Sequence, residues 1–210
     1  MPVDEPMYPV NLVVAGRRCL VIGGGAVAAR KVAGLVAAGA DVTVVAPSIS
    51  AEIAVLGVSC VHRSYERADL EGVWLVMVAT GDRAVNAGVR ADCDAARVWV
   101  NAADDPQACS FTLPALVRQG PVMVTVSTSG YSPALAVWLR EHVAAELGPE
   151  VTVLAEWLSE ARLALQAEGR STEDIDWRPA LNWDMLKLIR AGHTARARER
   201  LQACLSSSSA

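Results

Sequence analysis

The first half of the chain alternates short β-branched runs with stretches of helical periodicity. Such an alternation is typical of a parallel sheet covered by helices. The run at residues 73–79 is the most hydrophobic, so we expect it to form the central strand. The predicted strands are 18–22, 41–45, 58–62, 73–79 and 97–100, and the predicted helices between them are 26–38 and 82–96.

The alternation ends where a polar loop begins, at residues 104–110. This loop leads into residues 111–117, where Pro114 fits a strand end better than a central strand. After a turn at 120–121, a strongly alternating pattern predicts a strand at 122–126.

The last third of the chain is helical in character. Ser132 is expected to cap a helix that Pro133 opens and that ends before Gly148 and Pro149. Three further helices are predicted from apolar residues that recur at helical spacing. These residues are Leu154, Trp157, Leu158, Ala161 and Leu165 in the first helix, Leu181, Met185, Leu188 and Ile189 in the second, and Ala197, Leu201 and Leu205 in the third.

Composition narrows the class of protein. Hydrophobic residues make up 52% of the 210 residues, which allows a buried core and excludes a disordered protein. The net charge of -4 argues against a nucleic-acid binder, because such proteins carry a basic excess. The five cysteines are irregularly spaced without a CxxC pair, so they indicate free thiols in a reducing compartment rather than a zinc site or a disulfide framework. We find neither a signal peptide nor an apolar run of membrane-spanning length, so we expect a soluble, cytoplasmic protein.

The segment Gly23-Gly-Gly-Ala-Val-Ala28 matches the pattern GxGxxG/A between a predicted strand and a predicted helix. In that pattern Gly23 permits the tight turn, Gly25 permits close approach to a pyrophosphate, and Ala28 lets the helix pack on the strand. The context predicts dinucleotide binding in a Rossmann-type domain. The alternative is a structural glycine turn in an unrelated α/β domain.

One feature of this pattern is missing. The acidic residue expected to bind the ribose, at the end of the second strand, is replaced by Ala46-Pro47-Ser48. The Ser48 hydroxyl, or backbone groups of Ala46 and Pro47, can serve instead. Arg30 and Lys31 could favour a 2′-phosphate, although such residues are more often solvated. The motif alone therefore favours NAD over NADP.

Two further segments carry candidate chemistry. Asn101-Ala-Ala-Asp-Asp-Pro106 follows a strand, where ligands of open α/β sheets bind, and a carboxylate there can take a proton while a nicotinamide takes a hydride. For Asp-Asp-Pro in isolation, an ordinary turn is the favoured interpretation. The hydroxyls and amides of Ser127 to Ser132, flanked by Arg118 and Arg140, suit a carboxylate or phosphate equally as well as an N-cap loop.

Taken together, these segments resemble the precorrin-2 dehydrogenases, the N-terminal module of siroheme synthases that also occurs as a stand-alone protein. The resemblance covers roughly residues 8–147. The matching segments are Tyr8–Asn11, Val21–Lys31, Ala79-Thr80, Val85-Asn86, Asn101–Asp105, Cys109–Phe111, Pro114-Ala115 and Val126–Pro133.

The resemblance implies an enzyme that oxidises precorrin-2 to sirohydrochlorin with NAD, and many members also insert ferrous iron to give siroheme. It implies that Asp104 is the essential carboxylate, and it accounts for the missing ribose acid at Ala46. Thr128 falls where some relatives carry serine. The residues expected to bind the cofactor are Gly23, Gly24, Gly25, Ala26, Val27, Ala46, Pro47, Ser48 and Thr80. Those expected to bind the substrate are Ser127, Thr128, Ser129, Gly130 and Arg118, and we expect no dedicated metal ligands.

The expected architecture is therefore an α/β Rossmann-type domain with a mostly parallel sheet (residues 1–113), a small α+β dimerisation segment (114–148) and a helical C-terminal domain (149–210). The expected partners are the tetrapyrrole substrate, ferrous iron if the enzyme is also a chelatase, and a second copy in a homodimer. The sequence leaves chelatase activity undecided. Two alternatives stay open: a non-catalytic NAD-sensing module, and a Rossmann dehydrogenase for another carboxylate-rich substrate.

Overall fold

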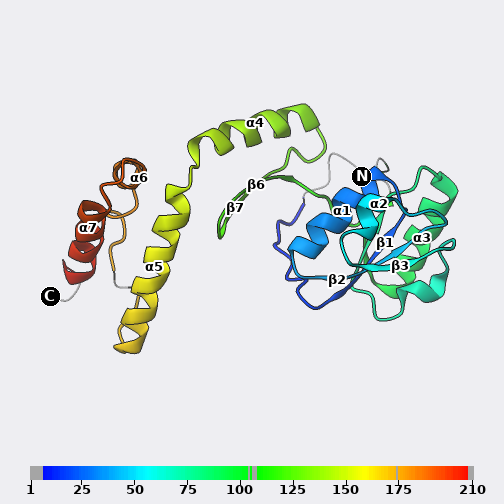
Figure 1. Cartoon of the computed structure of the whole chain (residues 1–210), viewed down its shortest axis with the longest axis horizontal. Helices are drawn as coiled ribbons and strands as arrows, with labels where there is room; N and C mark the ends of the chain where they lie inside the picture. The colour runs from blue at the N-terminus through cyan, green and yellow to red at the C-terminus, as the bar shows by residue number, and fades with distance from the viewer. Residues whose placement is uncertain (1–6, 104, 106–107, 174, 208–210) are drawn as a thin grey trace. The chain divides into compact units, whose positions relative to one another are not determined.

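The computed structural model describes residues 7–103, 105, 108–173 and 175–207. The chain forms two compact units. The first comprises residues 1–113 and 129–131, and the second comprises residues 114–128 and 132–210 (Figure 1). No helix among the described residues is long and apolar enough to cross a membrane.

The first unit is built on a parallel sheet of five strands. The strand order is β3-β2-β1-β4-β5, and every neighbouring pair is parallel. Its elements are β1 (Arg18–Ile22), α1 (Ala26–Ala37), β2 (Asp41–Val45), α2 (Ala51–Ala54), β3 (Ser59–Val61), η1 (Arg67–Leu70), β4 (Leu75–Val78), α3 (Arg83–Ala96) and β5 (Trp99–Ala102). The predicted α/β Rossmann-type fold is confirmed.

Successive residues of the strands point to opposite faces of the sheet, and each face has its own core. On one face, Val21 of β1 and Met77 of β4 pack with Val32 of α1. On the other, Ile22 and Val78 pack with Val89 of α3. Because both faces are covered, the strands are mostly apolar.

Two predictions about the strands are wrong in detail. The central strand is β1, not β4, because hydrophobicity reports that both faces are covered and not the order of the strands. The strand predicted at 97–100 lies at Trp99–Ala102. Arg97 adopts a left-handed conformation with φ of 57° and ends α3, while the Val98 N–H donates to the Cys93 carbonyl, so the strand starts later.

The second unit consists of a hairpin followed by helices. β6 (Ala115–Gln119) and β7 (Val122–Val126) pair antiparallel, and α4 (Pro133–Glu146) contacts both strands. The Ser132 side chain accepts a hydrogen bond from the Leu135 N–H, which confirms the predicted cap. The remaining helices are α5 (Glu150–Ala167), α6 (Trp183–Arg190) and α7 (Thr194–Ser207), which share a core around Trp157, Met185 and Leu201.

A buried carboxylate ties two of these helices together. Glu150, at the start of α5, is 4% exposed, and the Arg190 guanidinium at the end of α6 donates from Nε to its Oε1 over 3.0 Å. The hydrogen bond from Arg190 holds the pKa of the Glu150 carboxyl below its usual range. The pair therefore fixes α6 against the first turn of α5.

Candidate active site

The turn between β1 and α1 fits tightly between the ends of the two neighbouring strands. Gly23 has φ of +119°, a conformation that side chains rarely adopt. A Cβ at Gly23 would overlap the carbonyl oxygen of Ala79, directly after β4, and would lie 2.8 Å from its carbonyl carbon. On the other side, the Gly23 N–H donates to the Val45 carbonyl at the end of β2 over 3.0 Å. The first glycine is therefore fixed by the scaffold itself.

Gly24 packs just as closely against the loop after β2. A Cβ there would overlap the Ser48 carbonyl oxygen and would lie 2.8 Å from the Ile49 Cα. The Ser50 N–H also donates to the Gly24 carbonyl over 2.9 Å. Both obstacles are backbone atoms, which cannot rotate away.

Gly25 is different, because the space beside it is open. A Cβ at Gly25 would meet no described atom within 4 Å. Gly25 is the N-cap of α1 and provides no side-chain cap, and the first hydrogen bond to its carbonyl comes from the Ala29 N–H. The amides of Ala26 and Val27 precede that bond, so the helix offers them no acceptor of its own. Open space in front of free helix amides fits an anion such as a pyrophosphate.

The other residues expected to contact the cofactor line the same edge of the sheet. Ala46 is buried and its N–H donates to the Val61 carbonyl over 3.1 Å, whereas Pro47 and Ser48 are exposed. Thr80 follows β4, and its hydroxyl donates to the Asn86 Oδ1 over 2.7 Å. The structure thus brings the loops after β1, β2 and β4 together at their carboxyl ends, where ligands of such sheets bind.

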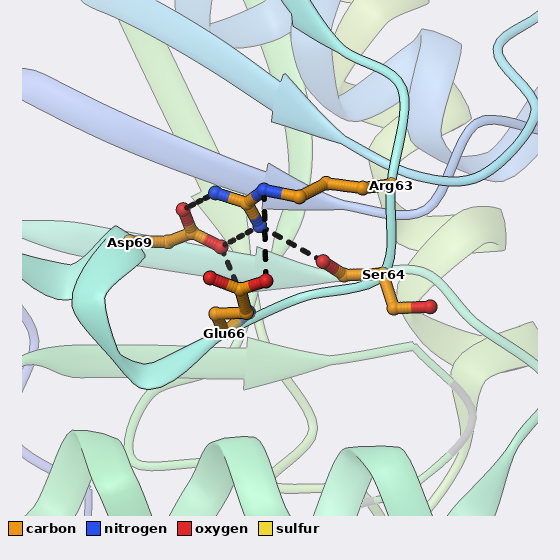
Figure 2. Close-up of polar contacts among 4 residues, drawn as sticks. All are labelled: Arg63, Ser64, Glu66 and Asp69. Carbon is orange, nitrogen blue, oxygen red and sulfur yellow. Dashed lines mark hydrogen bonds and ion pairs between the residues drawn. The ribbon is translucent and has the colours of Figure 1, made fainter.

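A cationic side chain, Arg63, follows β3, the strand that pairs with β2, and it is paired with carboxylates. Arg63 donates from Nη1 to Asp69 Oδ2 over 2.8 Å and from Nη2 to Oδ1 over 2.5 Å (Figure 2). Its Nε lies 3.9 Å from Glu66 Oε1, and its Nη1 also donates to the Ser64 carbonyl. These partners fix the guanidinium within the crossover between β3 and β4.

The β5 side of the same edge carries a network that the sequence analysis did not predict. Lys31 was expected to be solvated, yet it is half-buried and its Nζ donates to the Asn101 Oδ1 over 2.8 Å. Asn101 is 7% exposed and also donates to the Phe111 carbonyl over 3.0 Å. The proposed catalytic residue, Asp104, lies outside the described residues. A polar residue inside a strand is the signal that could have shown that Asn101 has a buried partner.

The residues expected to bind the substrate follow β7 or lie on β6. The Thr128 hydroxyl donates to the Ser132 carbonyl and accepts from the Ser132 N–H, which closes the loop before α4. Ser129 and Gly130 have positive φ, of 52° and 83°. Arg118 is exposed on β6, and its Nη2 lies 3.4 Å from the Met123 sulfur. Ser127 is exposed at the end of β7.

Within the part of the chain that the structure describes, no group of three His, Cys, Asp or Glu side chains could hold a metal ion. The described residues offer open space at the start of α1, which suits an anion, and a hydrogen-bonded network around Asn101 on β5.

Comparisons with known proteins agree with this geometry. A family described as putative NAD(P)-binding matches residues 10–115. The siroheme synthase 1 of Serratia proteamaculans is 35% identical over 202 residues, which are 92% of this chain and 42% of that protein. The siroheme synthase of Tolumonas auensis is 41% identical over 155 residues, which are 71% of this chain and 33% of that protein.

Among solved structures, a protein described as SirC, precorrin-2 dehydrogenase, is similar with a TM-score of 0.70 and 29% identity. The match covers 95% of this chain and 100% of that chain. The chain thus spans less than half the length of the two siroheme synthases, and it matches the solved structure from end to end.

Proposed function

Because the chain belongs to the putative NAD(P)-binding family, we propose that it is an NAD-dependent dehydrogenase that oxidises precorrin-2 to sirohydrochlorin in siroheme biosynthesis. The similarity to siroheme synthases and to a precorrin-2 dehydrogenase supports this choice of substrate. The observation that carries the proposal is the glycine turn. Two of its glycines are packed against backbone, while the third faces open space at the start of α1.

In this proposal the pyrophosphate of the cofactor binds the amides of Ala26 and Val27 in front of Gly25. Ala46, Pro47 and Ser48 bind the adenosine ribose, with the Ser48 hydroxyl in place of the usual carboxylate. Bound NAD supplies the acceptor for the hydride that the substrate loses.

We favour NAD over NADP for two reasons. Residues 46–48 carry no cation that could pair with a 2′-phosphate. Arg63, which follows the neighbouring strand β3, already pairs with Asp69 in a bidentate contact. The 2′-phosphate of NADP would have to compete with the Asp69 carboxylate for the Arg63 guanidinium.

We assign the catalytic role to Asp104. The reaction removes a hydride and a proton from precorrin-2, and the carboxylate of Asp104 accepts the proton. Ser127, Thr128, Ser129, Gly130 and Arg118 bind the carboxylates of the substrate, through amides and hydroxyls at the start of α4 and through the guanidinium on β6.

The test is to incubate the chain with precorrin-2 and NAD and to follow the absorbance of sirohydrochlorin and NADH. We expect both products to form in equal amounts. Asp104→Ala should lower turnover by at least about 100-fold and leave the affinity for NAD unchanged. Turnover at the wild-type rate in this variant would remove Asp104 from the mechanism.

The same assay separates the alternatives. NAD binding without turnover of any tetrapyrrole would favour a sensing module, and turnover restricted to other carboxylate-rich compounds would favour a different dehydrogenase. Repeating the incubation with ferrous iron or cobalt tests for chelatase activity, with the metal ion as a substrate. No described residue argues for or against that second step.

We further propose that the chain has three parts: a nucleotide-binding domain at 1–113, a dimerisation segment at 114–148 and a helical domain at 149–210. Two copies of the chain would form a homodimer through the segment at 114–148. The support is an apolar surface on this segment: Leu135 and Trp138, three residues apart on α4, are 46% and 51% exposed. Large apolar side chains exposed together mark interaction surfaces. Sedimentation of the full chain should give twice the monomer mass.

We also propose a reducing compartment, the cytoplasm. All five cysteines are free thiols. Burial raises the pKa of Cys19 to about 11 and of Cys93 to about 12, so both thiols stay protonated at neutral pH.

A further inference from the structure

Lys31 links the helix at the glycine turn to strand β5. It lies in the second turn of α1, whose first turn carries the amides in front of Gly25. Its Nζ donates to the side-chain oxygen of Asn101, 2.8 Å away and 70 residues later in the sequence. Burying an ammonium group beside a neutral amide costs free energy unless the two groups are hydrogen-bonded. The contact is therefore a specific tie between the two elements.

Asn101 in turn contacts Cys109–Phe111, the segment that follows the Asp104 loop and lies along β5. Its Nδ2 donates to the Phe111 carbonyl over 3.0 Å and approaches the Cys109 sulfur at 3.6 Å. With Oδ1 occupied by Lys31, the orientation of the amide is fixed, because only Nδ2 can donate. Removing Lys31 would leave the amide held through Nδ2 alone.

The returning segment is held along β5 by three hydrogen bonds of Ser110. Its N–H donates to the Val100 carbonyl over 2.7 Å, and its hydroxyl accepts from the Val100 N–H over 2.8 Å. The same hydroxyl lies 3.2 Å from the Val100 carbonyl. Together with Asn101, Ser110 closes the base of the loop at 103–108.

The residues on either side of Asp104 in the sequence each make a backbone hydrogen bond. The Ala103 N–H donates to the Val78 carbonyl over 2.8 Å, which continues the pairing of β4 with β5. The Asp105 carbonyl accepts from the Ala108 N–H over 3.1 Å and lies 3.4 Å from the Cys109 sulfur.

We infer that Lys31 is a positioning residue. Through Asn101 it ties α1, the helix proposed to bind the cofactor, to the described residues on either side of Asp104 in the sequence, and turnover depends on this tie. The inference rests on the proposed function, because it takes Asp104 as the proton acceptor. Misplacing a catalytic group by about 1 Å can cost on the order of 100-fold in rate.

The first test needs no substrate. In Lys31→Met, hydrogen–deuterium exchange of the full chain should become about tenfold faster at the amides of Val100, Ala103 and Ser110, because the loop base opens more often. Exchange in β2 should not change. Arg30→Met, which removes the neighbouring exposed cation, should behave as wild type throughout. Unchanged exchange at Val100, Ala103 and Ser110 would overturn the inference.

The second test is kinetic. Lys31→Met should lower kcat at least about tenfold while KM for precorrin-2 and Kd for NAD stay within about twofold. Lys31→Arg keeps a donor for Asn101 and should restore most of kcat. Loss of NAD affinity instead of kcat would make Lys31 a cofactor ligand and overturn the positioning role.

The two tests keep the inference apart from the proposed function. If the wild-type chain does not oxidise precorrin-2, the proposed function fails, and the exchange rates still decide whether Lys31 holds the loop. If Lys31→Met does not fold, Lys31→Gln, whose shorter side chain does not reach as far, replaces it in both tests with the same expected results.

Discussion

The proposed cofactor site lies at the carboxyl ends of the strands, and its two sides are built in different ways. On the β2 side, the glycine turn and residues 46–48 meet through backbone atoms, as in the bond from the Ser50 N–H to the Gly24 carbonyl. On the β5 side, the loop base is held by side chains of Lys31, Asn101 and Ser110. The difference indicates which substitutions each side tolerates. The β2 side depends on the absence of side chains, and the β5 side depends on their identity.

The largest expected effect would break the β2 side. Gly24→Ala should unfold or strongly destabilise the first unit, by about 3 kcal/mol or more, because the new methyl overlaps backbone atoms of Ser48 and Ile49. NAD affinity should fall at least about 100-fold. Thermal unfolding and fluorescence titration with NADH measure the two effects.

Gly25→Ala is the matched control for that variant. Its methyl meets no described atom within 4 Å, so the free energy of unfolding should change by less than about 1 kcal/mol. Nucleotide affinity should nevertheless fall about tenfold or more, because the methyl occupies the space proposed for the pyrophosphate. Equal stability losses in the two variants would contradict the division between packed and open glycines.

The next effect would break the β5 side. Asn101→Ala leaves the Lys31 ammonium and the Phe111 carbonyl without this partner and should cost about 1–3 kcal/mol. Turnover should fall about tenfold, whereas Kd for NAD should stay within about twofold, because the glycine turn is intact. Denaturant unfolding and steady-state kinetics measure these quantities. A loss of NAD affinity equal to the loss of turnover would show that the two sides are not independent.

A smaller effect sharpens the contrast on the β3 flank. Hydrogen bonds from Arg63, and then the bond from the Glu66 N–H, hold the pKa of the Asp69 carboxyl below its usual range. Because the folded pKa lies below the unfolded value of about 3.9, the stabilisation is complete above that value and is lost as the pH falls through the folded pKa.

Asp69→Asn should therefore lower the melting temperature at pH 7 by about 2–5 °C, a small loss because the pair is partly exposed. It should also weaken the decline in stability below about pH 4. Glu71→Gln, an exposed carboxylate in the same segment, is the control and should leave the melting curves unchanged. A variant that binds NADP tightly while keeping its stability would assign the Arg63 contact to cofactor choice instead.

The smallest effect is expected at Ser48. Because the β2 side is built from backbone, Ser48→Ala should weaken NAD binding only about two- to fivefold, the value of one exposed hydrogen bond. The titration used for the glycine variants measures it. A loss near that of Gly25→Ala would show that a side chain dominates this side after all.

Most of the scaffold could be predicted from local patterns. The glycine turn, the first two strands and the Ser132 cap depend on residues close together in sequence, and the structure places them as expected. The order of the strands could not be predicted from hydrophobicity, since β1 and β4 are both covered on two faces.

The β5 network escaped prediction for a different reason. Lys31 and Asn101 are 70 residues apart, and neither shows a pattern that names the other. A lysine on a helix is usually solvated, so Lys31 gave no sign of a buried partner. The polar Asn101 ends a hydrophobic run, so the strand was predicted at 97–100, two residues before β5. Only the register of β5 beside β4 brings the Asn101 amide to the α1 face.

The open space at Gly25 has a consequence for regulation. A phosphate-binding site made of main-chain amides contains no group that gains or loses a proton near neutral pH. It also contains no lysine, arginine or histidine side chain that acylation or alkylation could modify. In the proposed complex, acidification or chemical modification would therefore affect the reaction through Asp104, Lys31, Arg118 or the carboxylates of the tetrapyrrole, while the binding of the dinucleotide phosphates stayed constant.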